Sequence, residues 1–319
     1  MKNVLITAKI PQAAIQILQQ AGLNVVSYSG EDLITKAELL KLIVDKDYLI
    51  TPLSTQVDQE VIDADPKLQF IANFGAGFNN IDVKYARQKG IPVTNTPKVS
   101  TVSTAEVTTG LIISLTHRIV EGDQLMRSTG FSGWAPLFFL GHELARKTLG
   151  ILGMGQIGQA VAKRMAAFDM KIIYTQRHQL APEIEKALNA RFVSMTDLIS
   201  QSDVLTLHAP LTPETHHILG AEQFSQMKNS AYLINASRGP VIDEKALLAA
   251  LQNHQLAGAA LDVYEQEPAV ATGFKELKNV ILTPHIGNAT VEARDAMAKI
   301  VADNTVLVAQ GKAPQYIVN

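Results

Sequence analysis

The 319-residue chain contains no cysteine, which excludes disulfide bridges, zinc sites built from thiolates and a cysteine nucleophile. Long apolar runs are missing too, because the longest, around residues 111–115, is far too short to cross a bilayer. The first seven residues are too few for the apolar core of a secretory signal and predict a short strand instead. We therefore expect a cytoplasmic protein without membrane contact.

An excess of charge of one sign is also lacking. The chain has 28 Lys and Arg against 30 Asp and Glu, for a net charge of −2, so it offers no basic face for nucleic acid. Hydrophobic residues make up 47% and charged residues 18%, which is typical of a globular protein. The length is sufficient for two domains, each with its own core.

A glycine motif at residues 153–158 predicts a dinucleotide site. An apolar strand is expected at 149–152, a helix follows the motif, and a second strand follows at 171–175. In G-x-G-x-x-G the first glycine permits a tight turn, the second lets the backbone approach a pyrophosphate, and the third lets helix pack on strand. An isolated motif could be a turn that binds nothing, but this order of elements favours a dinucleotide. The expected contacts are Gly153, Met154, Gly155, Gln156, Ile157 and Gly158. The helix should carry Ile157, Val161, Met165 and Phe168 on one face.

The rest of the chain alternates strands and helices, which implies parallel sheets with helices on their faces. A capping box at Thr35–Glu38 should open one helix, and another at Ser103–Glu106 should open a long helix to about Arg127. The single tryptophan, Trp134, follows in an aromatic-rich loop, where it either packs in a core or lines a substrate mouth. Strands are expected at 4–7, 24–28, 48–51, 69–74, 92–95, 149–152, 171–174, 191–193, 204–207, 232–235, 259–262 and 280–283, with helices at 244–252 and 289–309 and an extended tail at 313–319 that rejoins the first domain.

Three polar residues follow predicted strands of the second half, where ligands of α/β proteins bind. Arg238 offers a guanidinium that matches a carboxylate, His285 a group suited to proton exchange, and Glu267 a carboxylate that can orient an imidazole. Separately they could be a surface turn, a helix cap and a solvated loop. Together they provide what reduction of a 2-oxo acid requires. Histidines 178, 208, 216, 217 and 254 lack this placement, and we interpret most of them as solvent-facing or structural.

Five motifs in order resemble the D-isomer-specific 2-hydroxyacid dehydrogenase family, and the match covers nearly the whole chain. They lie at residues 153–158, 208–213 (HAPLTP), 235–240 (NASRGP), 262–268 (DVYEQEP) and 283–287 (TPHIG). The resemblance implies an α/β fold with a flavodoxin-like substrate domain at 1–101 and 291–319 and a Rossmann domain at 102–290. It also implies a homodimer joined through the cofactor domain. We expect no metal site.

The resemblance further implies the roles of site residues. Arg238 would bind the substrate carboxylate and carbonyl, His285 would be the acid/base, and Glu267 would pair with it. The backbone at Ala76 and Gly77, in a loop that could otherwise be a plain turn, would grip the carboxylate. Asp262 would contact the nicotinamide carboxamide. Further cofactor contacts are expected at Thr175, Gln176, Arg177, His208, Ala209, Pro210, Thr215, Ala236, Ser237, Arg238, His285 and Gly287.

The end of the second strand of the Rossmann domain bears on cofactor choice. NAD-binding sheets carry an Asp or Glu there, which accepts from the ribose 2′-OH. Here Thr175 and Gln176 occupy the position and Arg177 follows, which favours NADP(H), with NAD(H) as the alternative if Arg177 points to solvent.

The expected reaction is reduction of a small 2-oxo acid such as glyoxylate or hydroxypyruvate. A short D-3-phosphoglycerate dehydrogenase without a regulatory domain, and a dinucleotide-sensing regulatory protein, are the alternative functions.

Overall fold

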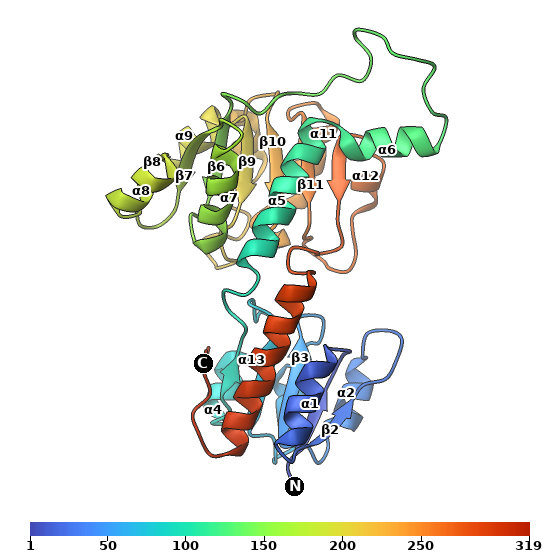
Figure 1. The fold of residues 1–319 in the computed structure, drawn as a ribbon, viewed down its shortest axis with the longest axis vertical. Helices are drawn as coiled ribbons and strands as arrows, with labels where there is room; N and C mark the ends of the chain where they lie inside the picture. Colours follow the sequence, from blue (N-terminus) through green and yellow to red (C-terminus); the bar gives the residue numbers. More distant parts are fainter. The chain divides into compact units, whose positions relative to one another are not determined.

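The computed structural model describes residues 1–319, which divide into two compact units (Figure 1). Unit 1 contains Met1–Ser100 and Ala289–Asn319, and unit 2 contains Thr101–Asn288. The chain therefore leaves unit 1 once and returns to it for its last helix and tail.

Unit 1 contains a five-stranded parallel sheet in the order β2-β1-β3-β4-β5, the order of flavodoxin-like folds. One face packs against α1 and α13, and the other against α2, α3 and α4. The central strands β1, β3 and β4 are buried on both faces, as parallel strands are, while the edge strand β2 is partly exposed. The elements are β1 (Asn3–Ile6), α1 (Gln12–Gln20), β2 (Asn24–Ser27), α2 (Lys36–Leu42), β3 (Tyr48–Pro52), α3 (Gln59–Asp63), β4 (Phe70–Phe74), α4 (Val83–Gln88), β5 (Val93–Thr94) and α13 (Val291–Ala309).

Two local predictions in unit 1 are confirmed. The Thr35 hydroxyl accepts from the Glu38 N–H, and the Glu38 carboxylate accepts from the Thr35 N–H at 2.8 Å, so the capping box opens α2. The tail rejoins unit 1, because Ile317 forms an antiparallel bridge with Thr94 and the Val318 N–H donates to the Val93 carbonyl at 2.9 Å.

Unit 2 contains a seven-stranded parallel sheet in the order β12-β11-β10-β9-β6-β7-β8. The order reverses between β6 and β9, so the unit is a doubly wound Rossmann fold and the predicted fold class is confirmed. Its elements are α5 (Thr101–Thr116), α6 (Ile119–Arg127), β6 (Thr148–Leu152), α7 (Gln156–Ala166), β7 (Lys171–Thr175), α8 (Pro182–Leu188), β8 (Ala190–Phe192), α9 (Met195–Gln201), β9 (Val204–Leu207), α10 (Ala221–Gln226), β10 (Tyr232–Asn235), η1 (Gly239–Val241), α11 (Glu244–Gln252), β11 (Gly258–Leu261), α12 (Thr272–Lys275) and β12 (Val280–Leu282).

The long helix expected from Ser103 to about Arg127 is two helices, and that prediction is wrong. Arg118 adopts a left-handed conformation with φ 57° and separates α5 from α6. The returning chain stabilises the break, because the His142 N–H donates to the last carbonyl of α5, that of Thr116, at 2.9 Å. The Arg118 guanidinium also lies 4.0 Å from the Phe139 ring centroid. Since α5 begins at Thr101, Ser103 lies inside the helix and opens no capping box.

Two apolar side chains of unit 2 are more exposed than a core position allows. Trp134 is 83% exposed in the loop that runs out beyond α6 in Figure 1, which excludes the first of its two predicted places, the core, and leaves the substrate mouth as a prediction. The prediction that Phe168 shares the apolar face of α7 is wrong, because the helix ends at Ala166 and Phe168 lies in the following turn, 41% exposed. The other buried positions of α7 follow the helical spacing, with Val161 and Met165 fully buried.

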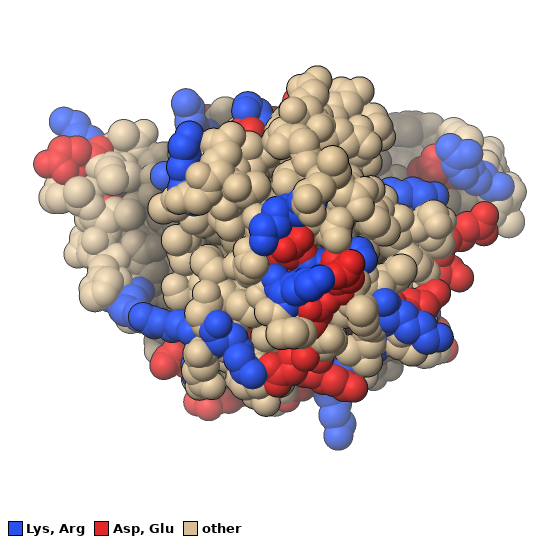
Figure 2. All heavy atoms as spheres, turned by 90° about the horizontal axis from the view of Figure 1, so that it is seen from below, with Lys and Arg blue, Asp and Glu red and all other residues tan.

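The surface carries charge of both signs. On the side seen in Figure 2, Lys and Arg lie among Asp and Glu with much uncharged surface between them. No helix of the chain combines the length and the apolar character needed to cross a membrane.

Candidate active site

The glycine loop after β6 is shaped by close backbone contacts. Gly153 has φ +96°, and a Cβ there would lie 2.6 Å from the Ala209 nitrogen at the end of β9. A Cβ at Gly158 would lie 2.3 Å from the Gly153 oxygen. The first and third glycines are therefore required by sterics. A Cβ at Gly155 would meet no atom within 4 Å. The second glycine therefore faces open space, from which a ligand can approach the protein backbone.

The first turn of α7 offers donors to such a ligand. Gly155 is the N-cap, no side chain caps the helix, and no acidic residue lies in its first turn. Free N–H groups and the helix dipole at this end suit a pyrophosphate. Both the shape and the donors of residues 153–158 therefore fit a nicotinamide dinucleotide.

The segment after β9 is held by its own hydrogen bonds. The Thr215 hydroxyl donates to the Pro210 carbonyl at 2.6 Å and accepts from the Thr212 N–H at 2.8 Å. His208 Nε2 lies 3.1 Å from the Thr206 hydroxyl, while its Nδ1 is buried without a protein partner. Burial lowers the pKa of His208 to about 3, so this ring is neutral at physiological pH. Neutral His208 cannot act as the proton donor of the site.

Arg238 follows β10 in a turn that Asn235 fixes. The Asn235 amide donates to the Arg238 carbonyl at 3.0 Å, and its oxygen accepts from the Ser237 N–H and hydroxyl. A Cβ at Gly239 would lie 1.9 Å from the Tyr264 carbonyl carbon, so the turn packs directly on the segment that carries Glu267. Burial lowers the pKa of Arg238 and the Glu267 charge opposes this shift, while a guanidinium still stays charged at neutral pH.

Glu267 and His285 form a direct pair at the ends of the neighbouring strands β11 and β12. His285 Nδ1 lies 2.8 Å from Glu267 Oε2, with side-chain exposures of 28% and 36%. The other carboxylate oxygen accepts from the Tyr264 N–H at 3.1 Å. Burial raises the pKa of Glu267, but the bond to His285, its charge, the Tyr264 N–H and the Arg238 charge together hold it below its ordinary value. The Glu267 carboxylate therefore stays ionised. Because it binds Nδ1 of the imidazole, the other ring nitrogen, Nε2, is available to a ligand.

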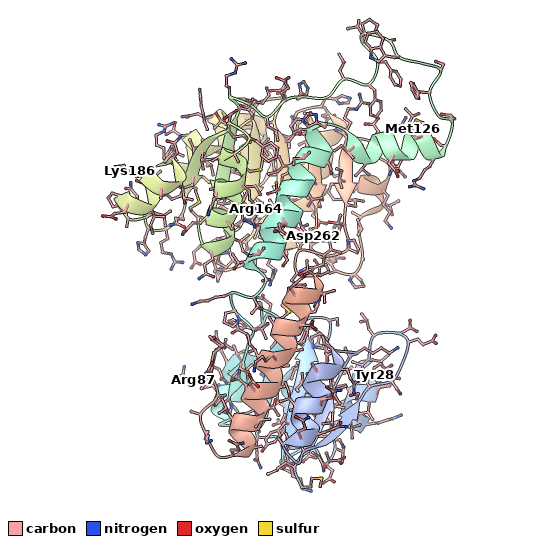
Figure 3. All side chains as sticks on the ribbon, in the orientation of Figure 1. Tyr28, Arg87, Met126, Arg164, Lys186 and Asp262 are labelled. Atoms are coloured by element: carbon pink, nitrogen blue, oxygen red, sulfur yellow. The ribbon has the colours of Figure 1, made fainter.

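Asp262 holds the backbone of the His285 loop, a role that sequence reasoning missed. Its Oδ1 accepts from the Thr283 hydroxyl at 2.6 Å and the Ile286 N–H at 2.8 Å, and its Oδ2 accepts from the Gly287 N–H at 2.8 Å. Figure 3 labels this residue on unit 2. His285 has φ +53°, an uncommon backbone conformation, and these three bonds stabilise the loop on both sides of it.

A second clamp, also missed from the sequence, joins the Glu267 segment to α11. The Glu265 N–H donates to the Glu244 carboxylate at 2.8 Å, and the Glu244 N–H donates to the Glu265 carboxylate at 3.3 Å. His217 Nε2 lies 2.6 Å from the same Glu265 oxygen. Burial raises the pKa of Glu244, and the charges of Glu265 and Glu267 add to this. No sequence pattern could have indicated these pairs, because their members lie about twenty residues or more apart.

Ala76 and Gly77, the expected carboxylate contacts, lie in unit 1 directly after β4. Both are partly buried, and neither N–H donates to another group of the chain. They thus offer two backbone donors next to each other.

The remaining expected cofactor contacts lie at the carboxyl ends of strands of unit 2. Thr175 ends β7, and Gln176 bridges two loops, since its Oε1 accepts from the Met154 N–H at 3.0 Å and its Nε2 donates to the His178 carbonyl at 2.7 Å. Arg177 is exposed. Ala236 and Ser237 are buried in the turn before Arg238. No group of three or more His, Asp or Glu gathers in a way that could hold a metal ion.

Comparison with known proteins agrees with this geometry. Residues 109–287 match the model of the D-isomer specific 2-hydroxyacid dehydrogenase NAD-binding domain. A protein named as a 2-hydroxyacid dehydrogenase from Staphylococcus haemolyticus is 54% identical over all of both chains. A glyoxylate reductase from Paecilomyes thermophila superposes with TM-score 0.87 at 33% identity, covering 99% of this chain and 98% of the other. An NADPH-dependent glyoxylate/hydroxypyruvate reductase from Sinorhizobium meliloti, in complex with NADP and malonate, gives 0.83 at 31% identity, covering 99% and 96%. The chain therefore belongs to the D-isomer specific 2-hydroxyacid dehydrogenase family, NAD-binding enzymes that act on the CH–OH group of their donors.

Proposed function

We propose that this enzyme reduces a small 2-oxo acid, glyoxylate or hydroxypyruvate, to the corresponding D-2-hydroxy acid, with NADPH as the preferred cofactor. The observation that carries the proposal is the pair of His285 Nδ1 and Glu267 Oε2 at 2.8 Å, beside the turn of Arg238. Two solved relatives are named as reductases of these acids, which supports the choice of substrate.

Each residue has a defined task in this proposal. Residues 153–158 and the first turn of α7 hold the nicotinamide dinucleotide, which supplies a hydride when bound. Protonated His285 donates from Nε2 to the substrate oxygen, while ionised Glu267 holds Nδ1 and stabilises the imidazolium. Arg238 binds the carboxylate and stabilises negative charge that develops on the oxygen. The proton and the hydride convert the carbonyl to the alcohol, and the reverse reaction returns the proton to neutral His285.

A substrate panel with both cofactors tests this function. Purified enzyme should oxidise NADPH faster with glyoxylate or hydroxypyruvate than with pyruvate or 3-phosphohydroxypyruvate. The phosphorylated acid is included because the sequence also allows a short phosphoglycerate dehydrogenase. No consumption of NADPH or NADH with any 2-oxo acid would refute the proposal.

The NADPH preference rests on the turn after β7. No carboxylate follows Thr175, and the Gln176 side chain is already bound to two backbone groups. The exposed Arg177 forms no ion pair, so its guanidinium is free for a 2′-phosphate. The Thr212 hydroxyl and, to a lesser extent, the Arg177 charge lower the pKa of Glu214. Arg177 is therefore within electrostatic range of Glu214 in the 212–215 segment.

Arg177→Ala should lower kcat/KM for NADPH by about tenfold or more, the effect of losing a charge-assisted hydrogen bond, and leave the value for NADH nearly unchanged. Steady-state kinetics with both cofactors measure the ratio. Arg191→Ala, which removes an exposed arginine from β8, is the matched control and should not alter it. A clear NADH preference in the wild type, or the same ratio in Arg177→Ala, would contradict the NADPH assignment.

Glu267→Gln should shift the pH profile of reduction toward lower pH. The Glu267 carboxylate lies 2.8 Å from Nδ1, where it stabilises an imidazolium, the form of His285 that donates the proton. Reduction needs that proton. As the pH is raised, the rate of reduction should therefore begin to fall at a lower pH in Glu267→Gln than in the wild type. The oxidation limb should move in the same direction. The pH dependence of kcat in both directions provides the measurement.

The control for this shift is Glu276→Gln, which neutralises an exposed glutamate of the same unit and should keep the wild-type profile. If Glu267→Gln also kept that profile, its carboxylate would not tune the imidazole.

A homodimer joined through unit 2 is part of the proposal. Apolar side chains of α6 and the following loop are exposed, among them Met126 (58%, labelled in Figure 3), Trp134 (83%) and Leu137 (84%). Several large exposed apolar side chains on one segment are typical of a protein interface, and a second copy offers the same side chains in a two-fold arrangement. Sedimentation of a single species with the monomer mass would exclude this dimer.

A further inference from the structure

Three successive carbonyl oxygens of the loop after β4 in unit 1 accept hydrogen bonds. The Gly75 oxygen accepts from the Thr96 N–H at 3.0 Å and from Asn73 Nδ2 at 3.2 Å. The Ala76 oxygen accepts from Asn95 Nδ2 at 2.6 Å, and the Gly77 oxygen from Asn73 Nδ2 at 2.6 Å. Two asparagine amides thus bind three successive carbonyls of the loop.

The N–H groups of the same three peptides have no such partners. Within the chain, neither Ala76 nor Gly77 nor Phe78 donates a backbone hydrogen bond. Each peptide unit therefore has its oxygen bound to an asparagine amide and its N–H free. Hydrogen bonding at the oxygen polarises the peptide and strengthens its N–H as a donor. The three groups form a concentrated set of donors suited to a carboxylate.

The orientation of the Asn73 amide is fixed by a further asparagine. Asn80 Nδ2 donates to Asn73 Oδ1 at 3.3 Å and to the carbonyls of Pro52 and Thr55 at 3.1 and 3.0 Å. Because the Asn73 oxygen accepts from Asn80, its Nδ2 must face the loop. Asn73 is fully buried and Asn80 is 5% exposed, so the arrangement is part of the core at this edge of the sheet.

The charge around the loop also favours an anion. Phe74, the residue before it, lies under the guanidinium of Arg294, which is 5.9 Å from the ring centroid. Arg294 forms no ion pair, and burial lowers its pKa from its ordinary value. A partly buried guanidinium without a carboxylate partner places one uncompensated positive charge beside Phe74, next to the loop.

We infer that Asn73 and Asn95 are positioning residues for the substrate carboxylate. They turn the carbonyls of Gly75, Ala76 and Gly77 away from the ligand, so that the N–H groups of Ala76, Gly77 and Phe78 bind the acid group. This rests on the proposed function, because it concerns the carboxylate of the same 2-oxo acid. To the expected donors Ala76 and Gly77, the inference adds a third N–H donor, that of Phe78. It also adds two side chains, those of Asn73 and Asn95, that orient the three peptides.

Asn95→Ala tests the inference, since Asn95 is only partly buried and holds a single carbonyl of the loop. The KM of the 2-oxo acid that the wild type reduces best should rise about tenfold, the effect of weakening one hydrogen bond to a charged group. The KM for NADPH should stay the same. Asn95→Asp should raise the substrate KM further, because a carboxylate cannot donate and repels the substrate. Oxamate, titrated calorimetrically at saturating NADPH, should bind about tenfold more weakly to Asn95→Ala.

Asn3→Ala is the matched control. Asn3 Nδ2 also donates to one backbone carbonyl of unit 1, that of Asp45, at 2.8 Å, but at the opposite ends of the strands. It should lose as much thermal stability as Asn95→Ala while keeping the wild-type KM and oxamate affinity. If the wild type is active and Asn95→Ala behaves like Asn3→Ala, this inference is overturned and the proposed function is not. A wild type inactive with every 2-oxo acid would instead refute the proposed function and, with it, this inference.

Discussion

His285→Gln should lose turnover by about 10²–10⁴-fold, the usual contribution of a general acid–base group, while NADPH still binds. The reason is geometric. The imidazole is anchored through Nδ1 by Glu267 at 2.8 Å, and Asp262 binds Thr283 before it and Ile286 and Gly287 after it. Glutamine can keep a hydrogen bond to Glu267, but it cannot carry a proton to the substrate. Stopped-flow hydride transfer and NADPH fluorescence titration separate chemistry from cofactor binding.

Two further variants make this result specific. His285 has φ +53°, and asparagine tolerates that conformation better than glutamine. His285→Asn should therefore be equally inactive with less disturbance of the loop. His117→Gln replaces an exposed histidine of the same unit and should keep full activity. A kcat near the wild-type value in either His285 variant would remove this residue from the acid/base role.

Much of the fold follows from periodicity and glycine placement. The helix at 244–252 has its predicted bounds, because an Asp243 cap and inward Leu247 and Leu251 define it locally. The break at Arg118 could not be predicted, since it depends on residues 139–142 returning to the end of α5. The exposure of Trp134 could not be predicted either, because tryptophan is highly buried on average and its residue type alone favours a place in a core. Local patterns thus predicted elements, and distant contacts changed their ends.

The site shows the same division. Strand ends could be found from the sequence, so Arg238, Glu267 and His285 could be proposed as neighbours of a ligand. The residues that support them could not be recognised. Asp262 follows a strand like many structural acids, and only the folded chain shows its bonds to Thr283, Ile286 and Gly287. Asn73 and Asn95 are also ordinary strand-end residues in the sequence. Their role depends on carbonyls that turn toward them in the folded loop.

Arg238→Lys should raise the KM for 2-oxo acids and lower kcat, so that kcat/KM falls about a hundredfold. A guanidinium binds a carboxylate with two parallel hydrogen bonds, while an ammonium keeps the charge but not this geometry. The loss corresponds to about 2.7 kcal/mol, within the range for removing hydrogen bonds to charged groups. Both parameters should change, because Arg238 also stabilises charge that develops on the reacting oxygen. Steady-state kinetics over a range of substrate concentrations measure the two effects separately.

Arg118→Lys is the matched control, because Arg118 makes the same kind of two-pronged contact at another place in unit 2. Its Nε and Nη2 donate to the two carboxylate oxygens of Glu121 at 2.9 and 2.7 Å. Losing that contact should cost some stability at the end of α5 and leave kcat and KM near the wild-type values. If Arg238→Lys behaved like Arg118→Lys, Arg238 would be a structural residue.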